Sequence, residues 1–200
     1  MSLLLRVVAP VALAAALGGC SLGGLLGGGK TPTTLLTLTP EAPDPGQIQR
    51  SANAAQTVTI SVPIVAKELR TARIPVQITP TDVQYVTDAQ WVDTPDRLFQ
   101  DLVAETVRRT TGRVVLNARQ SNLDPGLVVS GELQRFGYDA QTGQVTVQYD
   151  GALSTESGTR VETRRFTASV PSDGTAVSVG PALNRAANQV AGEIARWIGG

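Results

Sequence analysis

Apolar residues in the C-terminal half of the chain recur with two different periods, which predict strands and helices in separate stretches. Apolar and polar residues alternate with a period of two in residues 127–136, 144–153 and 160–170. Glycine-containing turns at about residues 141–143 and 156–158 separate these three segments. The pattern therefore predicts a meander of three antiparallel strands.

A period of about 3.6 predicts two amphipathic helices, one before and one after the meander in the sequence. The first covers about residues 95–111, with Thr94 as its N-cap and Pro95 in its first turn. The second covers about residues 175–198 and is capped by Asp173. The predicted buried stripes are Leu98, Phe99, Leu102, Val103, Thr106 and Val107 in the first helix, and Leu183, Ala187, Val190, Ile194 and Trp197 in the second.

Shorter apolar segments predict further strands ahead of the meander. They lie at residues 35–38, 57–62, 74–78 and 83–86, with one more at 114–116. We therefore predict an α+β fold: an antiparallel or mixed β-sheet with the two amphipathic helices packed on one face.

The N-terminus carries a different pattern, an apolar run from Val7 to Leu17 that is too short to span a bilayer. Leu17-Gly18-Gly19-Cys20 follows, and this sequence resembles the lipobox of bacterial lipoproteins. The resemblance implies that signal peptidase recognises Leu17, Gly18 and Gly19, that Cys20 is acylated, and that Ser21 directs sorting to the outer membrane. An ordinary secretory signal, or a buried thiol in an N-terminal helix, is the alternative.

These segments divide the chain into three parts. Residues 1–19 are the predicted signal peptide, residues 20–33 a glycine-rich tether, and residues 34–200 a single periplasmic domain. In this interpretation the protein is lipid-anchored through Cys20 and faces the periplasm from the outer membrane.

Composition removes most catalytic chemistry. The chain has no histidine and one cysteine, so catalytic triads, His-based acid–base chemistry and Zn–thiolate sites are excluded, and no cofactor is expected. Its 17 basic and 17 acidic residues give no net charge, and aromatic residues make up only 4%. We therefore expect no nucleic-acid partner.

The remaining candidates are carboxylates, arginines and apolar docking residues. Asp101 and Glu105 lie one helical turn apart and suit general acid–base catalysis, but a solvated face paired with Arg108 and Arg109 explains them better. Arg164 and Arg165 suit phosphates or acidic head groups, but as neighbours on a strand they face opposite sides, so surface solubility is the safer interpretation.

Two apolar features are candidates for docking a partner. Trp91 precedes the first helix and suits either core packing, which we favour, or an exposed docking site. Leu36 and Leu38 belong to a short predicted strand whose edge can pair with a second chain.

The order of these features resembles the ABC-type transport auxiliary lipoproteins, the PqiC/YmbA-like family. The shared features are the lipobox, Leu36-Thr37-Leu38-Thr39-Pro40, Ile60-Ser61-Val62-Pro63, Trp91 before a helix, the meander, and a C-terminal helix containing Ala186-Ala187-Asn188-Gln189-Val190-Ala191 and Trp197. The resemblance covers about residues 34–198. A tyrosine that the family commonly has after the Val-Pro strand is missing from residues 66–70.

Membership implies a non-enzymatic auxiliary component of an Mce-type system. Its partners would be an Mce-domain protein and an ABC transporter permease and ATPase that move phospholipid or other hydrophobic molecules across the periplasm, and a homo-oligomer is possible. One alternative is an assembly lipoprotein for an outer-membrane β-barrel or lipopolysaccharide machine. Another is an envelope hydrolase using acids among Asp101, Glu105, Asp150 and Glu156.

Overall fold

The computed structural model describes residues 34–117, 120, 126–155 and 160–199. The predicted signal peptide and tether, and with them Leu17, Gly18, Gly19, Cys20 and Ser21, lie outside the described residues.

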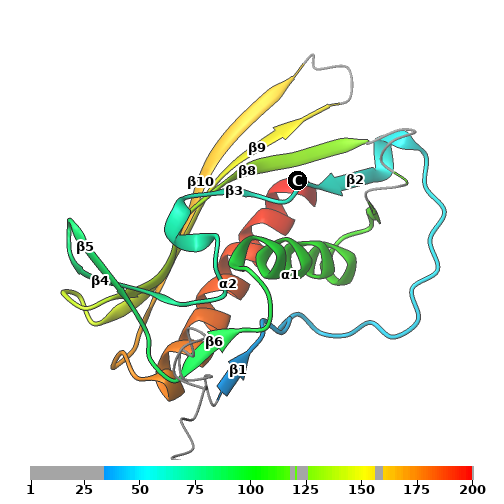
Figure 1. Cartoon of the computed structure of the whole chain (residues 1–200). Coiled ribbons are helices and arrows are strands. Elements are labelled where there is room, and N and C mark those ends of the chain that lie inside the picture. The colour runs from blue at the N-terminus through cyan, green and yellow to red at the C-terminus, as the bar shows by residue number, and fades with distance from the viewer. Residues whose placement is uncertain (1–33, 118–119, 121–125, 156–159, 200) are drawn as a thin grey trace, which may run out of the picture. The chain divides into compact units, whose positions relative to one another are not determined.

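The predicted meander is confirmed (Figure 1). Strands β8 (Leu127–Asp139), β9 (Gln144–Ser154) and β10 (Val161–Pro171) pair antiparallel in the order β10-β9-β8. Alternation sends one set of side chains inward, so that Val145 and Val147 are fully buried and Tyr149 is nearly so. This face of the meander forms one wall of the core.

Three short strands pair in parallel with successive parts of the other edge of β8. β2 (Thr57–Ile60), β3 (Ile64–Val65) and β4 (Pro75–Thr79) each pair parallel with β8, in chain order. β7 (Val114–Leu116) adds to the far side of β2, and β5 (Asp82–Tyr85) forms a hairpin with β4. The sheet is therefore mixed, one of the two arrangements that the sequence left open.

A second, two-stranded sheet joins β1 (Thr34–Leu36) to β6 (Ala89–Trp91) in parallel. The sequence analysis did not predict β6, which has only three residues and no alternating pattern long enough to recognise. Two short 3₁₀ turns, η2 (Ala54–Gln56) and η3 (Lys67–Leu69), complete the N-terminal half.

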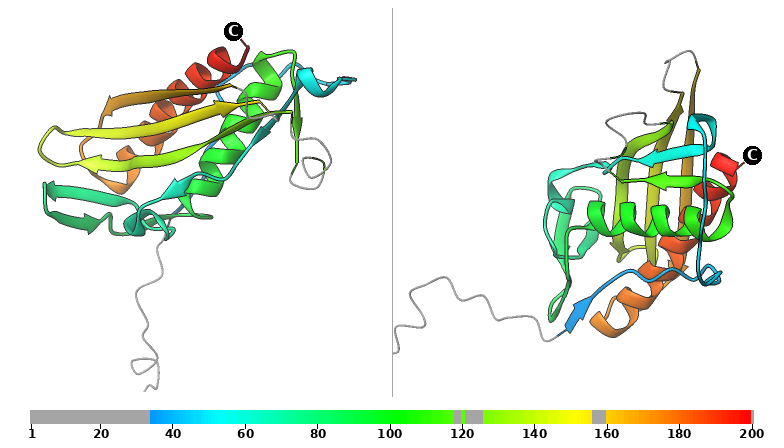
Figure 2. Two further views of the ribbon diagram at one scale, coloured as in Figure 1. Left: turned by 90° about the horizontal axis from the view of Figure 1, so that it is seen from above. Right: turned by 90° about the vertical axis from the view of Figure 1, so that its right-hand side faces the viewer.

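Both predicted helices form, α1 (Pro95–Thr110) and α2 (Ala176–Gly199), and they pack together against the strands (Figure 2). Their predicted stripes are buried with two exceptions, Leu98 and Trp197, which are half-buried. The α+β prediction is therefore confirmed as a curled mixed sheet with two helices against its strands.

The two helix starts differ in detail from the prediction. Thr94 occupies the N-cap position of α1, but its side chain makes no capping hydrogen bond. At α2 the hydroxyl of Thr175, rather than the Asp173 carboxylate, accepts from the Ser178 N–H at 3.3 Å. Asp173 instead accepts from the N–H and hydroxyl of Thr175 at 2.9 and 2.8 Å, so it orients the capping residue.

Candidate functional site

Trp91 is a core residue. Its side chain is 1% exposed and its ring centroid lies 5.5 Å from that of Phe136. A side chain this deeply buried offers a partner no surface, so the structure supports core packing and not docking for Trp91.

Leu36 and Leu38 are half-buried and pack against the core from the start of the domain. The side chain of Leu36 lies over Gly180 of α2, where an added Cβ would come within 2.9 Å of Leu36 Cδ2. Leu35, between Thr34 and Leu36, is 61% exposed. Any docking surface on this strand therefore centres on Leu35, since Leu36 and Leu38 face inward.

Two asparagines on α2 hold the chain that follows β1, a contact that the sequence analysis did not predict. The Asn184 side-chain oxygen accepts from the Thr39 N–H at 2.8 Å, and its amide donates to the Glu41 carboxylate at 3.2 Å. The Asn188 amide donates to the Thr39 carbonyl at 2.9 Å and its oxygen accepts from the Glu41 N–H at 2.8 Å. Asparagines four residues apart on one helical face are the sequence signal for this clamp.

The candidate acids do not converge on one site. Glu105 pairs with Arg109 at 2.8 Å and with Arg108 at 3.2 Å. These are the ion pairs that the sequence favoured over an acid–base role for Glu105. The hydrogen bond from Arg109 is the main cause that lowers the pKa of Glu105. Asp101 is exposed on α1. Asp150 lies on the sheet, bound at two points by Arg165, whose hydrogen bond lowers the Asp150 pKa. Glu156 lies outside the described residues.

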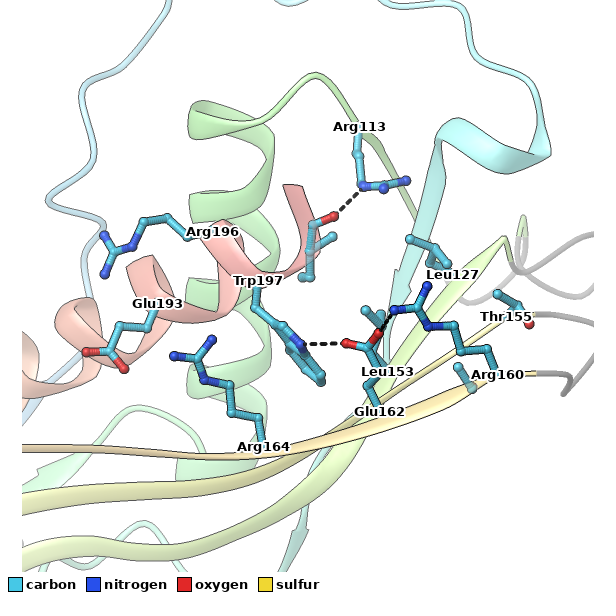
Figure 3. A pocket seen from close by; sticks show the side chains of 12 residues that line it. Arg113, Leu127, Leu153, Thr155, Arg160, Glu162, Arg164, Glu193, Arg196 and Trp197 are labelled. Atoms are coloured by element: carbon cyan, nitrogen blue, oxygen red, sulfur yellow. Dashed lines mark hydrogen bonds and ion pairs between the residues drawn. The ribbon is translucent and has the colours of Figure 1, made fainter. Parts of the chain in front are cut away.

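A cleft of about 750 Å³ lies between the last turns of α2 and the ends of β9 and β10 (Figure 3). Its volume is within the range of about 300–1,000 Å³ that small-molecule sites occupy. It is lined by Arg113, Leu127, Leu153, Ser154, Thr155, Arg160, Glu162, Arg164, Glu193, Arg196, Trp197 and Ile198. Four of these residues are arginines and two are glutamates.

The apolar part of the lining continues an aromatic row in the core. Ring centroids of Phe99 and Tyr149 are 5.4 Å apart, those of Tyr149 and Phe166 6.5 Å, and those of Phe166 and Trp197 5.4 Å. Burial raises the pKa of the Tyr149 phenol and keeps this row neutral. Gly151 passes beside it, and an added Cβ there would approach a Tyr149 ring carbon to 2.9 Å.

Trp197 is held in place at the cleft by Glu162. The indole N–H donates to Glu162 Oε2 at 3.3 Å, and the other oxygen of this carboxylate pairs with Arg160. Glu162 is thereby occupied by two donors. Arg160 offsets the negative charge of Glu162. The charge of the cleft therefore depends on the remaining arginines and on Glu193.

Arg113 and Arg164 present guanidinium groups to the cleft from opposite sides. Arg113 is fixed, because its Nε donates to the Ile198 carbonyl and its Nη1 to the Ala55 carbonyl, each at 2.9 Å. Arg164 lies with its guanidinium carbon 5.3 Å from the Phe166 ring centroid. Across the described part of the chain, Arg164 and Arg196 have no hydrogen-bond or ion-pair partner. The cleft therefore carries excess positive charge.

The sequence did not predict this cleft, because its residues come from β8, β9, β10, α2 and the loops beside them. It did predict that Arg164 and Arg165 face opposite sides of the sheet, and the structure confirms this. Arg165 pairs with Asp150, while Arg164 lies on the face that carries Phe166. The sequence signal for the cleft was Trp197, which we predicted to lie in a buried stripe. An aromatic residue next to an arginine in the last turn of a helix is suited to line a binding site.

Among the described residues, neither α1 nor α2 is long and apolar enough to cross a membrane. In the same residues, no group of His, Cys, Asp and Glu is arranged to hold a metal ion.

Comparison with known proteins identifies one family. The sequence model described as "ABC-type transport auxiliary lipoprotein component" matches residues 36–195 of the chain. The match includes β6, all of α1, the whole meander, and α2 except for its last four residues. The comparison with curated proteins found no match.

Two solved structures share the fold. The crystal structure of protein XCC0632 from Xanthomonas campestris, assigned to the DUF330 family model, aligns with a TM-score of 0.62 at 24% identity, covering 83% of this chain and 91% of that one. The crystal structure of an uncharacterized protein aligns with a TM-score of 0.61 at 13% identity, covering 83% and 98%. At these identities the likeness concerns the fold alone.

Proposed function

Because the chain belongs to the family of ABC-type transport auxiliary lipoprotein components, we propose that it is the outer-membrane, non-catalytic component of an Mce-type transport system. Its partners in this proposal are an Mce-domain protein and the ABC permease and ATPase. The cargo is a phospholipid or another hydrophobic molecule. The family match over residues 36–195 is the observation that carries the transport role.

The anchor in this proposal is Cys20, followed by a tether over residues 20–33 and a single domain over residues 34–200. Three acyl chains hold a lipoprotein to a membrane far more firmly than one, at about 0.8 kcal/mol for each buried CH₂. Ser21 sorts the protein to the outer membrane. The contacts of Asn184 and Asn188 with residues 39–41 support a boundary between tether and domain near residue 34. They fix the chain to the domain soon after the proposed tether ends.

Docking suits the described residues better than catalysis. Glu105 and Asp150 are both paired with arginines. Glu105 lies on α1, which packs on the face of the sheet that carries Tyr149, while Asp150 points to the opposite face, so the two carboxylates do not form one site. Leu35 and Val92 are exposed beside the small sheet of β1 and β6 and provide an apolar contact for a partner.

Co-purification tests this function. The full-length chain, tagged at its C-terminus and extracted in mild detergent, should bring down an Mce-domain protein, and deletion of its gene should disturb envelope lipid composition. A Leu35→Asp variant should weaken the association. Val161→Asp is the matched control, because Val161 is an equally exposed apolar residue that lies elsewhere, on β10. Recovery of an outer-membrane β-barrel protein instead, or no association together with an intact envelope, would contradict the proposal.

A further inference from the structure

The cleft beside Trp197 combines an apolar lining with positively charged side chains. Leu127, Leu153 and Trp197 give it an apolar lining, and Arg113, Arg160, Arg164 and Arg196 surround that lining with guanidinium groups. Against them stand Glu162, which is already paired with Arg160, and Glu193. An occupant with an apolar body and an anionic head would match both parts.

The arginines in the cleft differ in how free they are. The Nε and Nη1 groups of Arg113 are bound to carbonyl oxygens, which fixes the guanidinium and leaves Nη2 to donate. Among the described residues Arg164 makes no hydrogen bond or ion pair, its guanidinium carbon lies 5.3 Å from the Phe166 ring centroid, and Figure 3 shows it extending from β10 toward the last turns of α2. A guanidinium without a polar partner favours an anion whose oxygens can accept from several of its N–H groups, such as a phosphate.

The cleft does not favour a peptide. β9 is hydrogen-bonded on both sides, and the edge strand β10 lines the cleft with side chains such as Arg164, on the face of the sheet that carries Phe166. An occupant of the cleft therefore meets this face and not a strand edge to which it could add. Side chains alone must therefore recognise the ligand, and the volume of about 750 Å³ is that of a small-molecule site.

We propose that this cleft binds a single amphiphile with a phosphate head group, with its phosphate at Arg164 and its acyl part against Leu127, Leu153 and Trp197. The inference deepens the proposed transport function by naming a ligand class for this domain. It depends on the cleft and not on the identity of the transport partner.

The chain contains its own reporter for this site. It has two tryptophans, and Trp91 is 1% exposed, so a ligand in the cleft should change the fluorescence of Trp197 above a constant background. The full-length protein in a non-ionic detergent would be titrated with dihexanoylphosphatidic acid, followed by fluorescence and by calorimetry. Saturable binding with a Trp197 signal is expected, and Trp197→Phe should remove that signal.

Matched variants on one strand separate the cleft from general charge. Arg164→Gln and Arg165→Gln remove the same charge from neighbouring residues on opposite faces of β10. Arg164→Gln should weaken binding at least about tenfold, Arg164→Lys should weaken it less, and Arg165→Gln should leave it unchanged. Circular dichroism establishes that each variant is folded. Equal effects of the two glutamine variants would overturn the proposal.

Comparison ligands distinguish the possible sources of the anion. Inorganic phosphate and dihexanoylglycerol, which lacks the phosphate, should each bind at least about tenfold more weakly than the phosphatidic acid. If inorganic phosphate binds equally well, the apolar lining is unused and the site is one for free phosphate. If dihexanoylglycerol or an acidic hexapeptide binds equally well, recognition of a phosphate amphiphile is excluded. None of these outcomes depends on co-purification of an Mce-domain protein.

Discussion

Asn188 of α2 binds the backbone of Thr39 through its side-chain amide, with Nδ2 2.9 Å from the Thr39 carbonyl oxygen. The same side chain accepts from the Glu41 N–H, so one residue satisfies two backbone groups of an extended segment that belongs to neither sheet. This contact joins residues far apart in the sequence and fixes the entry of the chain into the domain.

Asn188→Ala should release this segment. Asn188 makes two hydrogen bonds to the segment, and each contributes about 0.5–1.5 kcal/mol. We therefore expect a loss of about 1–3 kcal/mol in the free energy of unfolding, with faster hydrogen exchange at the Glu41 amide. Gln189→Ala, at an exposed neighbouring position on α2, is the control. Unchanged exchange at Glu41 in the Asn188 variant would show that the clamp does not order the segment.

Gly131→Ala should destabilise the meander. Gly131 is opposite Gly151 across β8 and β9, and a Cβ at Gly131 would overlap the Asp150 carbonyl oxygen and lie 2.7 Å from the Tyr149 hydroxyl. Crowding of this kind costs about 1–3 kcal/mol, measured by urea unfolding. Gly112→Ala, where no atom lies within 4 Å of the added Cβ, should stay within about 0.5 kcal/mol of the parent protein.

The Glu105 ion pairs predict a pH dependence. Arg109 and Arg108 hold the pKa of Glu105 below its ordinary value of 4.5, so the ionised carboxylate stabilises the folded state. This contribution is complete above pH 4.5 and is lost as the pH falls through the lowered pKa of the folded state. Since Glu105 is about a third exposed, its size is below about 1 kcal/mol.

Urea unfolding of Glu105→Gln from pH 7 to pH 2 measures this effect. The variant should be slightly less stable than the parent at pH 7 and equally stable at the acid end. Asp101→Asn removes one negative charge from the same helix without breaking an ion pair that the structure describes. A stability difference for Glu105→Gln that stays constant down to pH 2 would rule out an electrostatic origin.

Cys20→Ser should abolish the acyl anchor. A serine hydroxyl cannot form the thioether to diacylglycerol, so the variant should keep its signal peptide and give no lipid-modified N-terminal peptide in mass spectrometry. Cell fractionation with Ser21→Asp in parallel tests sorting, and that variant should remain acylated but leave the outer membrane. An acylated, fully membrane-bound Cys20→Ser protein would refute the anchor.

The features that the sequence could predict are those encoded locally. α1, α2 and the three-strand meander each carry their own period over ten or more residues, and each forms within a few residues of its predicted bounds. β6 has three residues, and its parallel pairing with β1 depends on an approach that no local pattern records.

The cleft escaped prediction for a related reason. Arg113, Arg164 and Trp197 come from the segment before β7, from β10 and from α2, and they meet only once the sheet and helices have packed. The side to which Arg164 points was predictable from strand alternation. The residues opposite Arg164 in the folded domain were not predictable, because the sequence contains no signal for where α2 ends over the sheet.

The parallel pairing of β2, β3 and β4 along β8 has a consequence for how the chain acquires its structure. All three strands find their partner in residues that are synthesised much later, after α1 and β7. Contacts so distant in sequence close slowly. As the chain emerges from N-terminus to C-terminus, β4 can form its hairpin with β5, but β2, β3 and β4 lack their pairing with β8 until that strand arrives. A chaperone that shields these strands in the meantime would favour correct folding.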